Sequence, residues 1–116
     1  MFSFRWSNDA RRQYDELKKA SDKSAQTRGR TGKAKSSDQE GLFRQILKSL
    51  GLLSQNPRHP GLNSHKYTTI QDPGGKHRDL WESYAQNDTP GAYRIFWCYG
   101  PAKGEITIEA IVPHPD

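Results

Sequence analysis

Two histidines are the residues of this sequence whose type and placement best suit acid–base chemistry. His65 follows a loop braced by proline and glycine, and His114 follows the last apolar segment. Imidazoles exchange protons near neutral pH, so one can act as general base and the other as general acid without a metal ion. Cleavage of RNA needs such a pair, because the 2′-hydroxyl loses a proton and the leaving 5′-oxygen gains one. A terminal His-Pro-Asp is also typical of a frayed tail, so both interpretations of His114 stand at this point.

Arg94 could complete such a site. It interrupts the apolar segment 92–99, and a guanidinium within a central strand must meet a partner or an anion. One interpretation is a structural ion pair with Glu82 or Glu109. The other is a fixed cation that stabilises the phosphorane formed during cleavage.

Other kinds of site find less support. Cys98 lies within an apolar strand segment, so we expect a buried small hydrophobe rather than a nucleophile. The 4 histidines show no i, i+4 pairing and have no cysteine ligand nearby, so no metal site is predicted. Glycines cluster in hairpin turns instead of between a strand and a helix, so no nucleotide loop and no small-molecule cofactor are expected.

The composition indicates a small, polar and unevenly charged chain. At 116 residues and 13.2 kDa we expect one domain, residues 1–116. Only 32% of residues are hydrophobic, yet 3 Trp, 5 Tyr and 4 Phe argue against full disorder. Residues 1–60 hold 13 basic and 6 acidic side chains, against 5 and 7 in residues 61–116. The basic first half suits a polyanion or an acidic protein, although solubility alone would also explain it.

Hydrophobic periodicity indicates the elements that would position these residues. They are a strand at 2–6, helices at about 8–20 and 37–56, and strands at 65–70, 80–86, 92–99 and 105–112. Helices before a run of strands predict an α+β fold in the order β-α-α-β-β-β-β. We expect an antiparallel four- to five-stranded sheet with an N-terminal helical hairpin packed on one face. Alternation turns Tyr93, Ile95 and Trp97 toward the helices and leaves Arg94 on the opposite face.

Between the two helices, residues 21–38 have no large apolar side chain. From Lys23 to Lys35 there are 5 positive charges and no negative one. This composition predicts a flexible basic connector, which either contacts RNA phosphates or is simply solvated. No apolar run approaches the ~20 residues of a membrane helix, and no secretory signal is visible. A reducing, cytoplasmic location is therefore expected.

With these residues in view, the sequence resembles the RelE/ParE toxin superfamily, in particular RelE-like and YafQ-like mRNA interferases of type II toxin–antitoxin systems. The similarity is clearest in residues 56–67, 91–100 and 106–116. Leu62-x-x-His65-Lys66 after a proline loop is typical of these toxins. So are Gly-x-Tyr-Arg ending at Arg94 and a histidine after the last strand.

The resemblance implies roles for individual residues. His65 and His114 would transfer protons, and Arg94 would hold the scissile phosphate. Tyr84 stands where some relatives carry a histidine or lysine. The residues expected to bind RNA are Lys66, Arg58, Lys76, Arg78, Arg11 and Arg12. No metal or other cofactor is implied.

It also implies partners. The expected partners are a cognate antitoxin with an acidic or amphipathic segment and mRNA in the ribosomal A site. Two alternatives stay open: a non-catalytic inhibitor of DNA gyrase, as in the ParE branch, and a diverged chain that only binds an antitoxin. The sequence departs from the family in its long connector and in ending two residues after His114. Strict strand alternation also assigns His114 to the core face.

Overall fold

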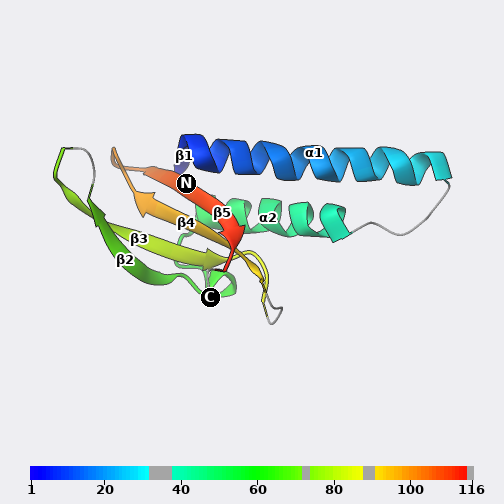
Figure 1. The fold of residues 1–116 in the computed structure, drawn as a ribbon. Helices are drawn as coiled ribbons and strands as arrows, with labels where there is room; N and C mark the ends of the chain where they lie inside the picture. Colours follow the sequence, from blue (N-terminus) through cyan, green and yellow to red (C-terminus); the bar gives the residue numbers. More distant parts are fainter. Residues whose placement is uncertain (32–37, 72–73, 88–90, 115–116) are drawn as a thin grey trace.

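The computed structural model describes residues 1–31, 38–71, 74–87 and 91–114 (Figure 1). The elements are β1 (Ser3–Trp6), α1 (Asn8–Thr31), α2 (Asp38–Gln55), the 3-10 turn η1 (Pro60–Leu62), β2 (His65–Gln71), β3 (His77–Tyr84), β4 (Tyr93–Tyr99) and β5 (Glu105–Pro113). This is the predicted α+β order. None of the described helices is long and apolar enough to cross a membrane.

The strands of the described chain form one sheet in the order β1-β5-β4-β3-β2. The β2–β3, β3–β4 and β4–β5 pairs are antiparallel as predicted, but β1 runs parallel to β5. The sheet is therefore mixed. No hairpin joins β1 to β5, so no turn fixes the direction of β1, and the prediction of a wholly antiparallel sheet was wrong there.

The first helix is longer than predicted. Helix α1 continues to Thr31, so the first part of the predicted connector at 21–38 is helical; residues 32–37 lie outside the described chain. Ion pairs stabilise this part of α1, which has no large apolar side chains to pack. Lys18 binds Asp22 one turn on at 3.0 Å, and Arg28 binds the buried Glu40 of α2 through two hydrogen bonds of 3.1 and 2.7 Å.

Strand β3 also differs from the prediction, beginning at His77 instead of residue 80 and ending at Tyr84 instead of residue 86. Pairing with β2 extends its start, because His77 lies opposite Gln71. At its end, the N–H groups of Ala85 and Gln86 both donate to the carbonyl of Tyr93 and close a turn. The predicted loop at 100–104 is confirmed, since β4 ends at Tyr99 and β5 begins at Glu105.

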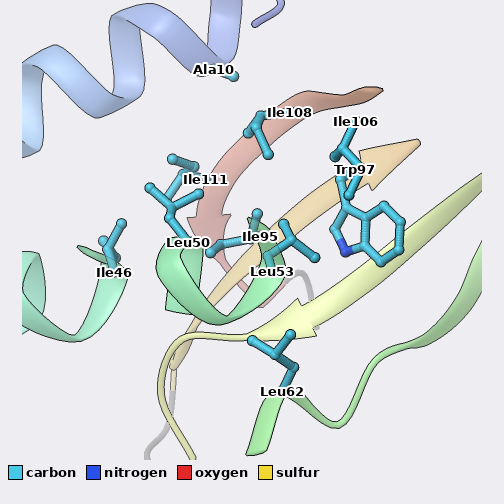
Figure 2. Close-up of a cluster of buried hydrophobic side chains, with 10 residues drawn as sticks. All are labelled: Ala10, Ile46, Leu50, Leu53, Leu62, Ile95, Trp97, Ile106, Ile108 and Ile111. Atoms are coloured by element: carbon cyan, nitrogen blue, oxygen red, sulfur yellow. The ribbon is translucent and has the colours of Figure 1, made fainter. Parts of the chain in front are cut away.

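The core fills the space between the sheet and the two helices, which Figure 1 shows on the same side. Figure 2 shows its members: Ala10, Ile46, Leu50, Leu53, Leu62, Ile95, Trp97, Ile106, Ile108 and Ile111. The predicted orientation of Ile95 and Trp97 toward the helices is confirmed. The Trp97 indole donates to Ser83 Oγ at 2.8 Å, and Ser83 is hydrogen-bonded to Ser64 at 2.7 Å. The residue that precedes His65 is thus tied to the core.

Candidate functional site

The strand register gathers the predicted catalytic residues on the sheet face that lies away from the helices. Directly opposed residues of antiparallel strands project to the same face. His65 lies opposite Glu82, and Tyr84 lies opposite Arg94. We call this surface the open face; its residues are His65, Tyr67, Arg78, Leu80, Glu82, Tyr84, Arg94, Phe96 and Cys98.

His65 has contacts at both ring nitrogens. Its Nδ1 lies 2.9 Å from the carbonyl oxygen of Asn63, and its Nε2 lies 2.7 Å from Oε1 of Glu82. Asn63 adopts a left-handed conformation with φ 48° after η1, which an asparagine tolerates well. The loop that the sequence marks with Pro60 and Gly61 therefore delivers the imidazole to the end of β3.

His114 reaches the same carboxylate from the end of β5. Its Nε2 lies 3.7 Å from Oε2 of Glu82, and its backbone N–H donates to Ala92 O at 2.8 Å. A register shift in the β4–β5 pair, where Phe96 faces Ala110 but Trp97 faces Ile108, reverses the alternation beyond that point. Strict alternation was therefore wrong in assigning His114 to the core face.

Arg94 is held against an aromatic ring. Its guanidinium carbon lies 3.7 Å from the centroid of the Tyr84 ring, and NH1 donates to the carbonyls of Gln86 at 2.6 Å and Tyr93 at 3.3 Å. No carboxylate of the described residues pairs with it, so the structural ion pair considered from the sequence is not formed. The residue is 8% exposed. The arginine is thus a buried cation neutralised by carbonyl and ring dipoles rather than by a counter-charge.

Comparison with known proteins rests on this architecture. No family model and no curated protein matches the sequence. Among solved structures, the YoeB/ParE toxin from Agrobacterium tumefaciens is similar, with a TM-score of 0.59 over 99% of this chain and 100% of that one. The chain has a RelE/ParE-like toxin fold. The two chains are 8% identical, so the likeness shows the fold alone.

On this RelE/ParE-like sheet, the residues predicted to bind RNA are divided among several surfaces. By register, Arg78 lies on the open face. Lys66 lies opposite Trp81, on the helix side, and pairs with Asp79 at 3.3 Å; the guanidinium of Arg58 stacks over the same Trp81 ring at 5.6 Å. The remaining residues of the predicted set are elsewhere. Lys76 precedes β3, and Arg11 and Arg12 lie on the exposed surface of α1, paired with Asp15 and Asp9.

Glu82 is a member of the site that was not predicted from the sequence. It is 1% exposed, and it contacts both histidines. The sequence carries a signal for it, because a charged residue interrupts a strand at Glu82 as it does at Arg94. From the sequence, Glu82 was expected only as a partner of Arg94 in an ion pair.

Two further observations bear on the chemistry available. Cys98 is fully buried, as predicted, and burial raises the pKa of its thiol from 9.0 to about 11, so it stays protonated at neutral pH. Within the described ranges, no three His, Cys, Asp or Glu side chains are grouped so as to hold a metal ion.

Proposed function

We propose that this chain is the toxin of a type II toxin–antitoxin system and that it acts as an endoribonuclease on mRNA, using side chains as acid and base. One observation carries the proposal. His65 and His114 come from distant parts of the sequence, and both place Nε2 within 3.7 Å of the Glu82 carboxylate. Tyr84, whose ring lies under the Arg94 guanidinium, packs edge-on against the His65 ring.

The proposed reaction needs two proton transfers and one stabilised charge. The 2′-oxygen forms a bond to phosphorus while the bond from phosphorus to the 5′-oxygen breaks, which leaves a 2′,3′-cyclic phosphate. One imidazole takes the 2′-hydroxyl proton, and the other protonates the departing 5′-oxygen. Because Nε2 of His65 is held by Glu82, His65 would meet the RNA through Nδ1, which has to leave the carbonyl of Asn63. Arg94 would stabilise the negative charge that grows on the phosphorane.

In this proposal the Tyr84 ring acts as a cover for Arg94. Because the guanidinium is 8% exposed, a phosphate reaches it only after the ring moves aside. Aromatic side chains near the site could hold the bases on either side of the cleaved bond by stacking. Tyr67, 46% exposed and packed edge-on against Phe96 with centroids 5.0 Å apart, is such a platform on the open face.

The partners of the proposal follow from charge. Basic side chains on the exposed surface of α1, including Arg11, Arg12, Lys18 and Lys19, would lie along ribosomal RNA beside the A site of cytoplasmic ribosomes. The same surface suits the acidic segment of a cognate antitoxin. Both complexes are expected to weaken steeply as salt concentration rises.

A non-catalytic, ParE-like inhibitor of DNA gyrase is the second candidate, and the burial of Arg94 favours it. A guanidinium covered by Tyr84 and bonded to two carbonyls has a structural role without RNA, although its Nε is buried with no hydrogen-bond partner in the described part of the chain. In a chain that binds only an antitoxin, Arg94 would have the same structural role.

The test is mRNA cleavage mapped on translating ribosomes, with wild type, His65→Ala, His114→Ala and Arg94→Ala. His77→Ala is the matched control, because His77 lies at the opposite end of β3 from Tyr84. We expect cuts with wild type and His77→Ala, and about 10²-fold or greater loss with each of the other three. Cuts that persist in those three would contradict the site assignment. No cuts, together with inhibited DNA supercoiling, would favour the gyrase inhibitor.

A further inference from the structure

The carboxylate at the centre of the open face takes no part in the reaction proposed above. Glu82 is 1% exposed within β3. A buried carboxylate is costly unless it is paired and hydrogen-bonded. Its position between two histidines therefore calls for a physical account.

His65 satisfies one oxygen of Glu82 and fixes the place of a proton. The carbonyl of Asn63 can only accept, so the His65 Nδ1 that lies 2.9 Å from it donates. The other ring nitrogen, Nε2, lies 2.7 Å from Oε1 of Glu82. Two lone pairs at this distance would repel, so a proton lies between these atoms, whichever of them carries it.

The second oxygen of Glu82 faces the second histidine. Oε2 is buried, has no hydrogen-bond partner in the described part of the chain, and lies 3.7 Å from Nε2 of His114. Buried polar atoms without a partner are few in native proteins, and a functional role is one accepted explanation.

The other charged and titratable groups on this face leave Glu82 to the histidines. Tyr84 packs edge-on against the His65 ring with centroids 5.8 Å apart. Arg94 is turned toward Tyr84 and two carbonyls. Among the described residues neither Arg94 nor Arg78, whose Nε is buried without a hydrogen-bond partner, forms an ion pair with Glu82. Tyr67 packs on Phe96, and Cys98 is fully buried.

We infer that Glu82 is the positioning residue of both histidines. It orients His65 through Oε1 and His114 through Oε2, and the proton shared with His65 Nε2 fixes the orientation of that ring. Because it is buried it does not reach RNA, so it acts only through the two rings. The kinetic part of this inference rests on the proposed RNA cleavage, whereas the structural part does not.

The first test is the NMR spectrum of the imidazole N–H protons in the full chain. We expect wild type to show a downfield, slowly exchanging proton at His65 Nε2, assigned by its loss in His65→Gln. Glu82→Gln, which keeps the shape and removes the charge, should lose this signal. His77→Ala is the control and should keep it, because His77 lies at the opposite end of β3 from Tyr84.

The second test is kinetic. Glu82→Gln should lower kcat for RNA cleavage by about 10²-fold with little change in KM, since misplaced rings slow proton transfer more than they weaken binding. His77→Ala should keep kcat. Glu82→Asp, which retains the charge on a shorter stem, should recover part of the loss.

The downfield signal persisting in Glu82→Gln, or its absence from wild type, overturns the inference, as does a folded Glu82→Gln with full kcat. If Glu82→Gln does not fold, Glu82→Asp replaces it. A changed chemical shift of the His65 N–H proton then supports the inference, and an unchanged chemical shift overturns it. If wild type cuts no RNA, the proposed function fails, and the NMR result still decides the role of Glu82.

Discussion

The two faces of this sheet bury side chains of opposite character from the same strands. Toward the helices, β4 places Ile95 and Trp97 in an apolar core, where the polar Ser83 is satisfied by hydrogen bonds. Toward the open face, the same strands bury Glu82 and Arg94 at 1% and 8% exposure. One face therefore stabilises the fold, and the other holds charges in fixed places, which costs stability and is typical of functional sites.

The largest effect should follow from removing the largest side chain of the helix-side core. Trp97→Ala should lower the free energy of unfolding by about 3–5 kcal/mol, because it leaves a cavity under α2. Urea denaturation measures this. Tyr67→Ala, on the open face and 46% exposed, is the control, and an equal loss there would contradict the division between the faces.

The open face should respond in activity rather than stability. Arg94→Lys keeps the positive charge but loses the planar guanidinium that stacks on Tyr84, so RNA cleavage should fall at least 10-fold. Single-turnover cleavage measures the effect. Lys66→Ala, on the opposite face, should change the rate little; a matching loss would place the phosphate site on the helix side instead.

A smaller effect on stability is expected from Ser83, which lies on the helix side of β3. Ser83→Ala removes the acceptor of the Trp97 indole and the partner of Ser64, and should cost about 1–3 kcal/mol because a buried donor is left unsatisfied. Thermal and urea unfolding measure the loss. No change in either would mean that these hydrogen bonds do not secure the start of β2.

The smallest effect depends on pH. Burial raises the pKa of the Cys98 thiol from 9.0 to about 11, so above pH 9 the unfolded chain releases a proton that the folded chain keeps. The free energy of unfolding should therefore fall as pH rises from 9 toward 11, by about 1 kcal/mol at pH 10. Cys98→Ala should lack this part of the slope. Equal slopes in both proteins would show that burial does not raise the pKa of the Cys98 thiol.

The sequence by itself determined the order of elements, the α+β class and the side of β4 that packs on the helices, because these follow from local periodicity. It also singled out His65, Arg94 and His114, since charged or titratable residues beside apolar strands are visible without a structure. It failed at α1, where the ion pair between Arg28 and Glu40 depends on α2, and at β1, whose parallel direction no turn encodes.

Only the tertiary structure decided what surrounds the singled-out residues. The register of β2 against β3 puts His65 opposite Glu82 and turns Lys66 to the other face, and the shift within β4 and β5 brings His114 to the open face. Register and bulges arise from pairing between distant strands, and a displacement by one residue moves every side chain to the opposite face. No local pattern in the sequence carries that information.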